Sequence, residues 1–163
     1  MDAYRTIITK RDTRSYSDRE IDEEILHRIL QAGRMAGSAK NAQPCRFIVV
    51  RSAEQKRELS KCGDWAEHLP NANVVVVIVV PVGARDFDAG RAAQNMMLAA
   101  WAEGIASCAV TLHHVDEARR VLKLPEGYQV AIAVPFGYPP PEGAKSLGAK
   151  RLPLEEIVHQ ESW

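Results

Sequence analysis

The chain has little cysteine, and the three cysteines that it has do not form a recognisable framework. Cys45, Cys62 and Cys108 are an odd number, and no two of them have the Cys-x-x-Cys spacing. Disulfide frameworks use even numbers of cysteines, and structural zinc sites use closely spaced pairs. We therefore expect free thiols that are buried in the core.

Long apolar segments and an excess of charge of one sign are also missing. The longest apolar run, residues 74–82, contains Pro81 and is too short for a transmembrane helix, and the N-terminal residues lack the apolar core of a signal peptide. Lys and Arg number 21, as do Asp and Glu, so the formal net charge is zero. No overall field then attracts nucleic acid or anionic lipid. We expect a cytoplasmic protein without a nucleic-acid or membrane partner.

The short motifs of several large enzyme classes are absent as well. The chain contains no Gly-x-Ser-x-Gly, no His-Glu-x-x-His, no P-loop and no Rossmann fingerprint. His113 and His114 are adjacent, so their side chains point apart, and no carboxylate or cysteine follows at a metal-binding spacing. We expect these two histidines to lie in a loop or at a strand end. The sequence indicates no metal site.

The length and composition of the chain predict one globular domain, 1–163. Its 163 residues are 46% hydrophobic and 26% charged, close to the average for globular proteins. Apolar periodicity predicts helices at 21–35, 52–63, 86–103, 116–121 and 153–159, and strands at 46–51, 74–80, 105–112 and 129–134. Strands separated by helices indicate a layered α/β or α+β domain. From about residue 139 the chain is rich in Pro and Gly, which predicts an extended arm.

Two of these elements carry most of the information about assembly. Residues 74–80 are all Val or Ile, which is typical of a central strand that is buried on both faces. The helix at 86–103 is rich in Ala and Met and has polar residues mainly near its start, so it should be buried all round. A domain of this size struggles to cover such a helix, and a second copy across a two-fold axis would do so.

A basic segment near the N-terminus and a basic pair near the C-terminus could bind an anion. Residues 10–14 read Lys-Arg-Asp-Thr-Arg after a predicted short helix, and Lys150 and Arg151 precede the last predicted helix. Arginine can bind phosphate oxygens through two hydrogen bonds, and clustered cations repel one another unless an anion lies among them. Each segment taken alone is also compatible with a solvated surface loop.

A stretch of small and polar residues, 37–44, reads Gly-Ser-Ala-Lys-Asn-Ala-Gln-Pro. Small side chains allow a flat ligand to approach the backbone, and Asn, Gln and Ser can bond the carbonyls and ring nitrogens of a heterocycle. An ordinary helix-to-strand loop is the alternative interpretation.

Together these segments resemble the nitroreductase family. K-R-D-T-R-S-Y is similar to the family's R-R-[SD]-x-R-x-[FY] opening, and G-S-A-K-N-A-Q-P-C-R-F-I-V-V to its A-P-S-x-x-N-x-Q-P-W-R-F-x-V-V block. F-D-A-G-R-A-A-Q-N-M-M-L-A-A-W-A-E-G-I-A-S-C and R-L-P-L-E-E-I-V-H resemble the two later blocks, in the family's order. The resemblance covers residues 4–163.

The resemblance implies an α+β fold, with a central, mostly antiparallel sheet flanked by helices, in an intertwined homodimer. It also implies an FMN-dependent oxidoreductase that takes hydride from NAD(P)H and reduces a small acceptor such as a nitroaromatic or a quinone. The flavin N5 would carry the chemistry, so no catalytic side chain is expected. This agrees with the absence of nucleophile and metal motifs.

The resemblance also implies the residues that bind FMN at the subunit interface. Lys10, Arg11 and Arg14 match contacts to the phosphate and ribityl chain, with Asp12 beside them, and Arg151 matches the C-terminal phosphate contact. Gly37, Ser38 and Ala39 match the loop that reaches the flavin of the other subunit. Asn41 and Gln43 match polar contacts in that region, and the backbone of Thr111 and Leu112 matches the segment that passes the flavin N5.

Three positions depart from the family pattern. Lys10 stands where Arg is common, Gly37 where Pro is common, and Cys45 where Trp is common. Two other functions stay open. The short chain and the loss of Trp at Cys45 are compatible with a flavin-binding or flavin-sequestering protein with little turnover, and Arg11, Arg14 and Arg151 would suffice for a silent dimer that binds another anion. The sequence selects neither the physiological acceptor nor NADH over NADPH.

Overall fold

The computed structural model describes residues 2–143 and 150–163. One four-stranded sheet has the order β1-β2-β4-β3, and each neighbouring pair is antiparallel. The strands are β1 (Arg46–Val50), β2 (Val74–Pro81), β3 (Ala106–Ser107) and β4 (Tyr128–Gly137). The predicted central antiparallel sheet is confirmed.

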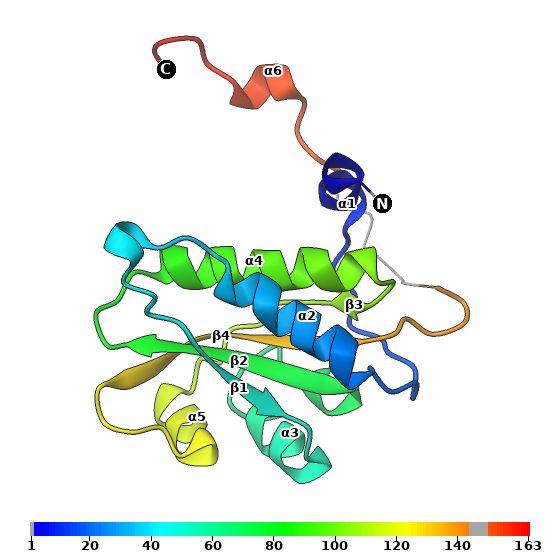
Figure 1. The fold of residues 1–163 in the computed structure, drawn as a ribbon, viewed down its shortest axis with the longest axis vertical. Helices are drawn as coiled ribbons and strands as arrows, with labels where there is room; N and C mark the ends of the chain where they lie inside the picture. Colours follow the sequence, from blue (N-terminus) through cyan, green and yellow to red (C-terminus); the bar gives the residue numbers. More distant parts are fainter. Residues whose placement is uncertain (1, 144–149) are drawn as a thin grey trace.

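Helices cover both faces of this sheet (Figure 1). On one face lie α2 (Glu23–Arg34) and α4 (Asp86–Ala102), and on the other lie α3 (Ala53–Ser60) and α5 (Val115–Leu122). Successive residues of a strand point to opposite faces. Residues 74, 76, 78 and 80 of β2 accordingly pack in the core with α2 and α4, whereas 75, 77 and 79 pack in the second core with α3 and α5. This explains why the run from 74 to 80 has no polar residue.

The helix α4 is only partly buried within one chain. Its buried side packs against α2, where Gly33 lies so close to Met96 that a Cβ at position 33 would overlap the thioether end. Its other side leaves Phe87, Arg91 and Gln94 exposed. A single chain therefore does not bury this helix all round, and its coverage by a second copy stays a prediction.

The predicted strand 105–112 is mostly irregular. Only Ala106 and Ser107 pair with β4, and Val110 forms one isolated bridge with Ala133. The backbone bonds of this segment go to different neighbours, since Ser107 accepts from the Thr13 amide and the His114 amide donates to the Cys62 carbonyl. The segment therefore has no single partner strand along its length, and it does not form a continuous strand.

Several helix ends also differ from the prediction. The helix predicted at 52–63 ends at Ser60, and its N-terminus is capped by Ser52, whose hydroxyl accepts from the Gln55 amide at 3.3 Å. The helix α5 begins after His114 and not after Asp116, which lies in its first turn, where a negative charge is favoured by the helix dipole. Asp22 precedes α2 but makes no capping bond through its side chain.

The terminal elements extend away from the sheet. The helix α1 (Ala3–Thr9) lies over one end of α4, and α6 (Leu154–Ile157) lies beyond it on an arm that projects from the body (Figure 1). The arm bears exposed apolar side chains, among them Leu154, Ile157 and Trp163. Among the described residues, no helix has the length and apolar character needed to cross a membrane.

Candidate functional site

The basic segment after α1 has only part of its charge available. The Lys10 ammonium is paired with Asp12 and lies 3.6 Å from the Met97 sulfur of α4. The Arg11 guanidinium folds back to donate to the carbonyls of Ile8 and Lys10, both at 2.9 Å. Arg14 is left as the cation of this segment that faces the sheet edge.

The Arg14 side chain lies against the Cys108 thiol beside β3. The chain at 12–13 runs along this edge, because Asp12 bridges Ser107 and the Thr13 amide donates to the Ser107 carbonyl at 3.0 Å. The hydrogen bond and charge interaction with Cys108 raise the pKa of Arg14, to which the charges of Glu67 and Asp12 also contribute. The guanidinium is thus held as a permanent cation at an exposed position.

Buried polar atoms without partners surround this arginine. Among the described residues, the buried side-chain atoms that lack a hydrogen bond are Thr13 Oγ1, Ser107 Oγ and both ring nitrogens of His68. The backbone of Trp65 and of Cys108 lies near the His68 ring without meeting hydrogen-bond geometry. Burial, followed by the charge of Arg14, lowers the pKa of His68. An unpartnered buried polar group costs about 1–3 kcal/mol, so these atoms need partners that the described residues do not supply, which bound water or a polar ligand could provide.

A tight turn at residues 62–66 holds the predicted flavin-facing backbone. A Cβ at Gly63 would lie 2.5 Å from the carbonyl oxygen of Thr111, and the His114 amide donates to the Cys62 carbonyl at 2.8 Å. The Asp64 amide donates to His113 Nδ1 at 3.2 Å, and the Asp64 carboxylate lies 3.3 Å from His114 Nε2. The two histidines therefore anchor this turn. Leu112 is buried beside it.

The loop at 37–45 adopts a shape that its residues do not favour. The short helix η1 (Ala39–Asn41) includes Lys40 and Asn41 at φ of 53°, and Gln43 has φ of 49°. Non-glycine residues in this left-handed region persist where the surroundings fix them. Here the Ser38 hydroxyl accepts from the Gln43 amide at 2.9 Å, which closes the loop.

A cavity of about 170 Å³ lies between this loop, the end of α2 and the start of α4. Its walls include Cys45, Phe47 and Asp88. Burial, and then the charge of Asp88, raises the pKa of the Cys45 thiol. Cys45, which stands where Trp is common in the family, is thus one of the residues that line this space.

The predicted site residues form two groups that one chain does not bring together. Lys10 contacts Met97 and the Trp101 indole donates to Thr9, whereas the loop meets Asp88 and Arg91 near the other end of α4. With a rise of 1.5 Å per residue, Asp88 and Trp101 are about 20 Å apart along the helix. Figure 1 shows η1 and α1 over opposite ends of α4.

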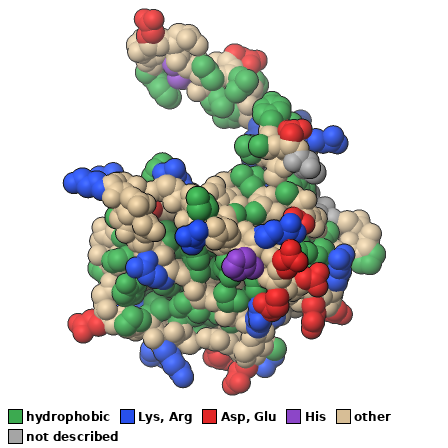
Figure 2. Space-filling view, in the orientation of Figure 1, with side chains coloured by type: hydrophobic (Ala, Val, Ile, Leu, Met, Phe, Trp, Pro, Cys, Tyr) green, Lys and Arg blue, Asp and Glu red, His purple; other side chains and the backbone are tan. Residues whose placement is uncertain are grey.

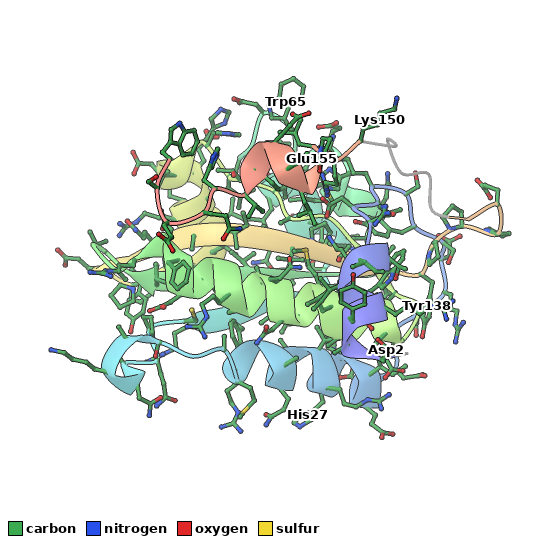
Figure 3. The ribbon with its side chains drawn as sticks, turned by 90° about the horizontal axis from the view of Figure 1, so that it is seen from above. Asp2, His27, Trp65, Tyr138, Lys150 and Glu155 are labelled. Atoms are coloured by element: carbon green, nitrogen blue, oxygen red, sulfur yellow. The ribbon has the colours of Figure 1, made fainter. Side chains whose placement is uncertain are left out.

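Arg151 is exposed and makes no hydrogen bond or ion pair with its side chain within residues 2–143 and 150–163. In Figure 3 the start of the arm, marked by Lys150 and Glu155, lies on the same side of α4 as Trp65, and His27 lies on the other side. The arm therefore begins on the side of the molecule that carries the turn at 62–66.

The sequence analysis did not identify His68, Ser107 or Cys108. Each is a single residue outside any motif of known spacing, and His68 was indistinguishable from a core histidine. They are identified in the structure by their position beside Arg14.

Comparisons with known proteins agree on one family. The model of the nitroreductase family matches residues 7–82 and 65–138. A protein of Archaeoglobus fulgidus, provisionally named NADH dehydrogenase/NAD(P)H nitroreductase, is 33% identical over 98% of this chain and 97% of its own length.

Two solved structures share the fold over nearly the whole chain. A provisionally named nitroreductase of Desulfovibrio desulfuricans in complex with FMN is 27% identical, with a TM-score of 0.83 and coverage of 100% of this chain and 99% of that one. An FMN-dependent nitroreductase of Clostridium difficile is 28% identical, with a TM-score of 0.86 and coverage of 97% and 98%.

Proposed function

This chain belongs to the nitroreductase family, and we propose that it is an FMN-dependent oxidoreductase that passes reducing equivalents from NAD(P)H to a small acceptor such as a nitroaromatic or a quinone. Relatives carry the names FMN reductase (NADPH) and FMN reductase [NAD(P)H], both from Bacillus subtilis. The identity of the acceptor is the open part of this proposal.

The observation that carries the proposal is the group of unpartnered polar atoms around Arg14. Thr13, Ser107 and His68 place hydroxyls and ring nitrogens in a buried position beside an exposed guanidinium. Hydroxyls and a neutral imidazole can both donate and accept, which suits the carbonyls and nitrogens of a heterocycle, and a guanidinium suits an anion. The residues present therefore fit FMN.

The chain's own residues would bind the cofactor and supply its charge environment. Bound FMN would supply the redox chemistry, because its ring accepts a hydride and passes electrons to an acceptor. Arg14 is the cation of the N-terminal segment that lies beside the unpartnered polar atoms, and Arg151 on the arm would add a second. Lys10 is already neutralised by Asp12, so its role is to hold the segment against α4.

The proposal includes a homodimer with the cofactor at the interface. The two groups of predicted site residues lie at opposite ends of α4, so residues 37–43 of one copy would complete the site of the other. The exposed Phe87 of α4 and the apolar side chains of the arm support this, since exposed apolar surface on an extended segment needs a partner. A cytoplasmic location is also proposed, in keeping with three free cysteines.

Absorbance spectroscopy of the purified full-length protein tests the proposal directly. We expect a yellow protein, or one that takes up FMN on titration, and loss of the flavin colour when NADH or NADPH is added without oxygen. Bound FMN that neither dinucleotide reduces would indicate a flavin-binding protein with little turnover. Protein that takes up no FMN would refute the assignment.

A further inference from the structure

Three arginine side chains surround the cavity beside η1 without a carboxylate partner. Arg34 and Arg46 line the cavity, and the Arg91 guanidinium lies against Gly37 at its edge. The ion pairs among the described residues include none of these three. We call this set the arginine rim. Figure 2 shows Lys and Arg side chains gathered around η1 at the left of the body, with little acidic surface visible among them.

Each guanidinium of the arginine rim keeps donors free. Arg46 donates to the carbonyls of Gln43 and Cys45 through one terminal nitrogen, at 2.8 and 2.9 Å. Arg34 donates to Gln31 through Nε at 2.9 Å, and Arg91 lies 5.6 Å from the Phe87 ring centroid. A guanidinium has five N–H donors, so these contacts leave most of them available.

Asp88 is the acidic residue that lines the cavity, and it offsets only part of this charge. Its carboxylate makes no ion pair within the described part of the chain and is half-buried. One negative charge beside three positive ones leaves the cavity mouth cationic. In a chain whose formal net charge is zero, this is a local concentration of charge.

Gly37 makes room for Arg91. A Cβ at position 37 would lie 2.8 Å from a terminal nitrogen of Arg91 and 3.2 Å from the other. Gly37 is not among the residues with positive φ, so its backbone conformation is one that other residues can adopt. The missing side chain therefore matters for the position of the guanidinium and not for the path of the loop.

The size and lining of the cavity limit what can bind. About 170 Å³ is smaller than the roughly 300–1,000 Å³ of a site for a complete drug-sized ligand, so it suits one ring with a substituent. Pro44, Phe47 and Ala92 give it apolar walls, while the rim is cationic. A flat apolar ring that bears an anionic group matches both parts.

We propose that the arginine rim selects small aromatic acceptors that carry a carboxylate. A carboxylate can accept two parallel hydrogen bonds from a guanidinium, and a neutral acceptor of the same shape gains no charge-assisted bond. The inference rests on the proposed function in one respect: residues 37–43 of one copy would complete the flavin site of the other, which would place an acceptor held at the rim beside the cofactor. Arg91 then acts as a specificity-determining residue.

Binding of benzoate and benzamide to the full-length protein, measured by isothermal titration calorimetry, tests the rim without turnover. We expect wild type to bind benzoate more tightly than benzamide, and Arg91→Ala to reduce that preference about tenfold. Gly37→Ala should reduce it as well, because the guanidinium must move. Arg57→Ala, which removes an exposed arginine of α3, is the matched control and should leave the preference unchanged.

Steady-state kinetics with 4-nitrobenzoate and 4-nitrobenzamide give a second readout. The ratio of their kcat/KM values should fall about tenfold in Arg91→Ala, while the KM values for NADH and NADPH stay unchanged. Equal binding of benzoate and benzamide by wild type would overturn the inference. So would an Arg91→Ala variant that changes only the dinucleotide KM, or only the dissociation of the dimer. Protein that takes up no FMN refutes the proposed function, while the benzoate preference still reports on the rim.

Discussion

The Arg14 guanidinium lies against the Cys108 thiol at the edge of the sheet, and this contact raises the pKa of the arginine. The two residues are brought together because the chain at 12–13 pairs with Ser107. A thiol is a weak acceptor, so most of the hydrogen-bonding capacity of Arg14 is still available. The arginine is held in place without being neutralised, which is what a residue that binds an anion requires.

Replacing Arg14 by alanine should weaken FMN binding. A charge-assisted hydrogen bond contributes about 1.5–3 kcal/mol, so the Kd for FMN should rise roughly tenfold to a hundredfold. Fluorescence titration of FMN into the apoprotein measures this, with Arg57→Ala as a control of equal charge change. Unchanged affinity in Arg14→Ala would show that the anion binds elsewhere.

The buried histidine should make stability depend on pH. Burial and the charge of Arg14 lower the pKa of His68 below its ordinary value of 6.5, so the folded state favours the neutral ring. Well above pH 6.5 the ring is neutral in both states and contributes no pH dependence. As the pH falls below 6.5, the unfolded state binds a proton that the folded state does not, and the free energy of unfolding decreases.

Urea denaturation of wild type and His68→Gln between neutral and acidic pH tests this sign. The difference in free energy of unfolding between the two proteins should change as the pH falls below 6.5, with wild type losing more. Parallel pH profiles for the two proteins would contradict the prediction. The experiment is best done on apoprotein, because a bound ligand adds its own linkage.

Two glycines should respond differently to the same substitution. In Gly63→Ala the new methyl group meets the Thr111 carbonyl, which is backbone, and we expect a loss of about 1–3 kcal/mol in the free energy of unfolding. In Gly37→Ala the neighbour is the mobile end of Arg91, so stability should stay close to that of wild type. Denaturant titration compares them, and equal losses would mean that the loop at 37–45 is as tightly packed as the turn at 62–66.

The sequence predicted the parts of the fold that rest on continuous patterns. The run of Val and Ile at 74–80 and the helix at 86–102 were found because their burial is repeated over many residues. The segment 105–112 was predicted as a strand because it is apolar. In the structure the Ser107 carbonyl accepts from the Thr13 amide and, just after the segment, the His114 amide donates to the Cys62 carbonyl. No local sequence pattern encodes such long-range bonds.

The candidate site was predictable to the extent that it is built from motif residues. Arg14 and the loop at 37–43 were assigned to the site by resemblance alone. The ion pair between Lys10 and Asp12 is a side-chain contact that their spacing in the sequence did not specify. His68 enters the site because the turn after α3 is held by Gly63 and Asp64. Such tertiary contacts leave no periodic signal in the sequence.

The C-terminal arm should hold the dimer together. Ile157 is 54% exposed in one chain and lies on α6, which projects from the body, so replacing it by aspartate disturbs no core packing within that chain. If the arm packs on a second copy, the same substitution buries a charge at the interface, which is strongly unfavourable. Sedimentation of Ile157→Asp should therefore show a shift toward monomer at micromolar concentrations, together with weaker FMN binding. Val115→Asp changes an apolar residue of similar exposure at the start of α5 and should leave both unchanged. A dimeric Ile157→Asp variant with full FMN affinity would mean that the arm does not contribute to the site, and the proposed role of Arg151 would fall with it.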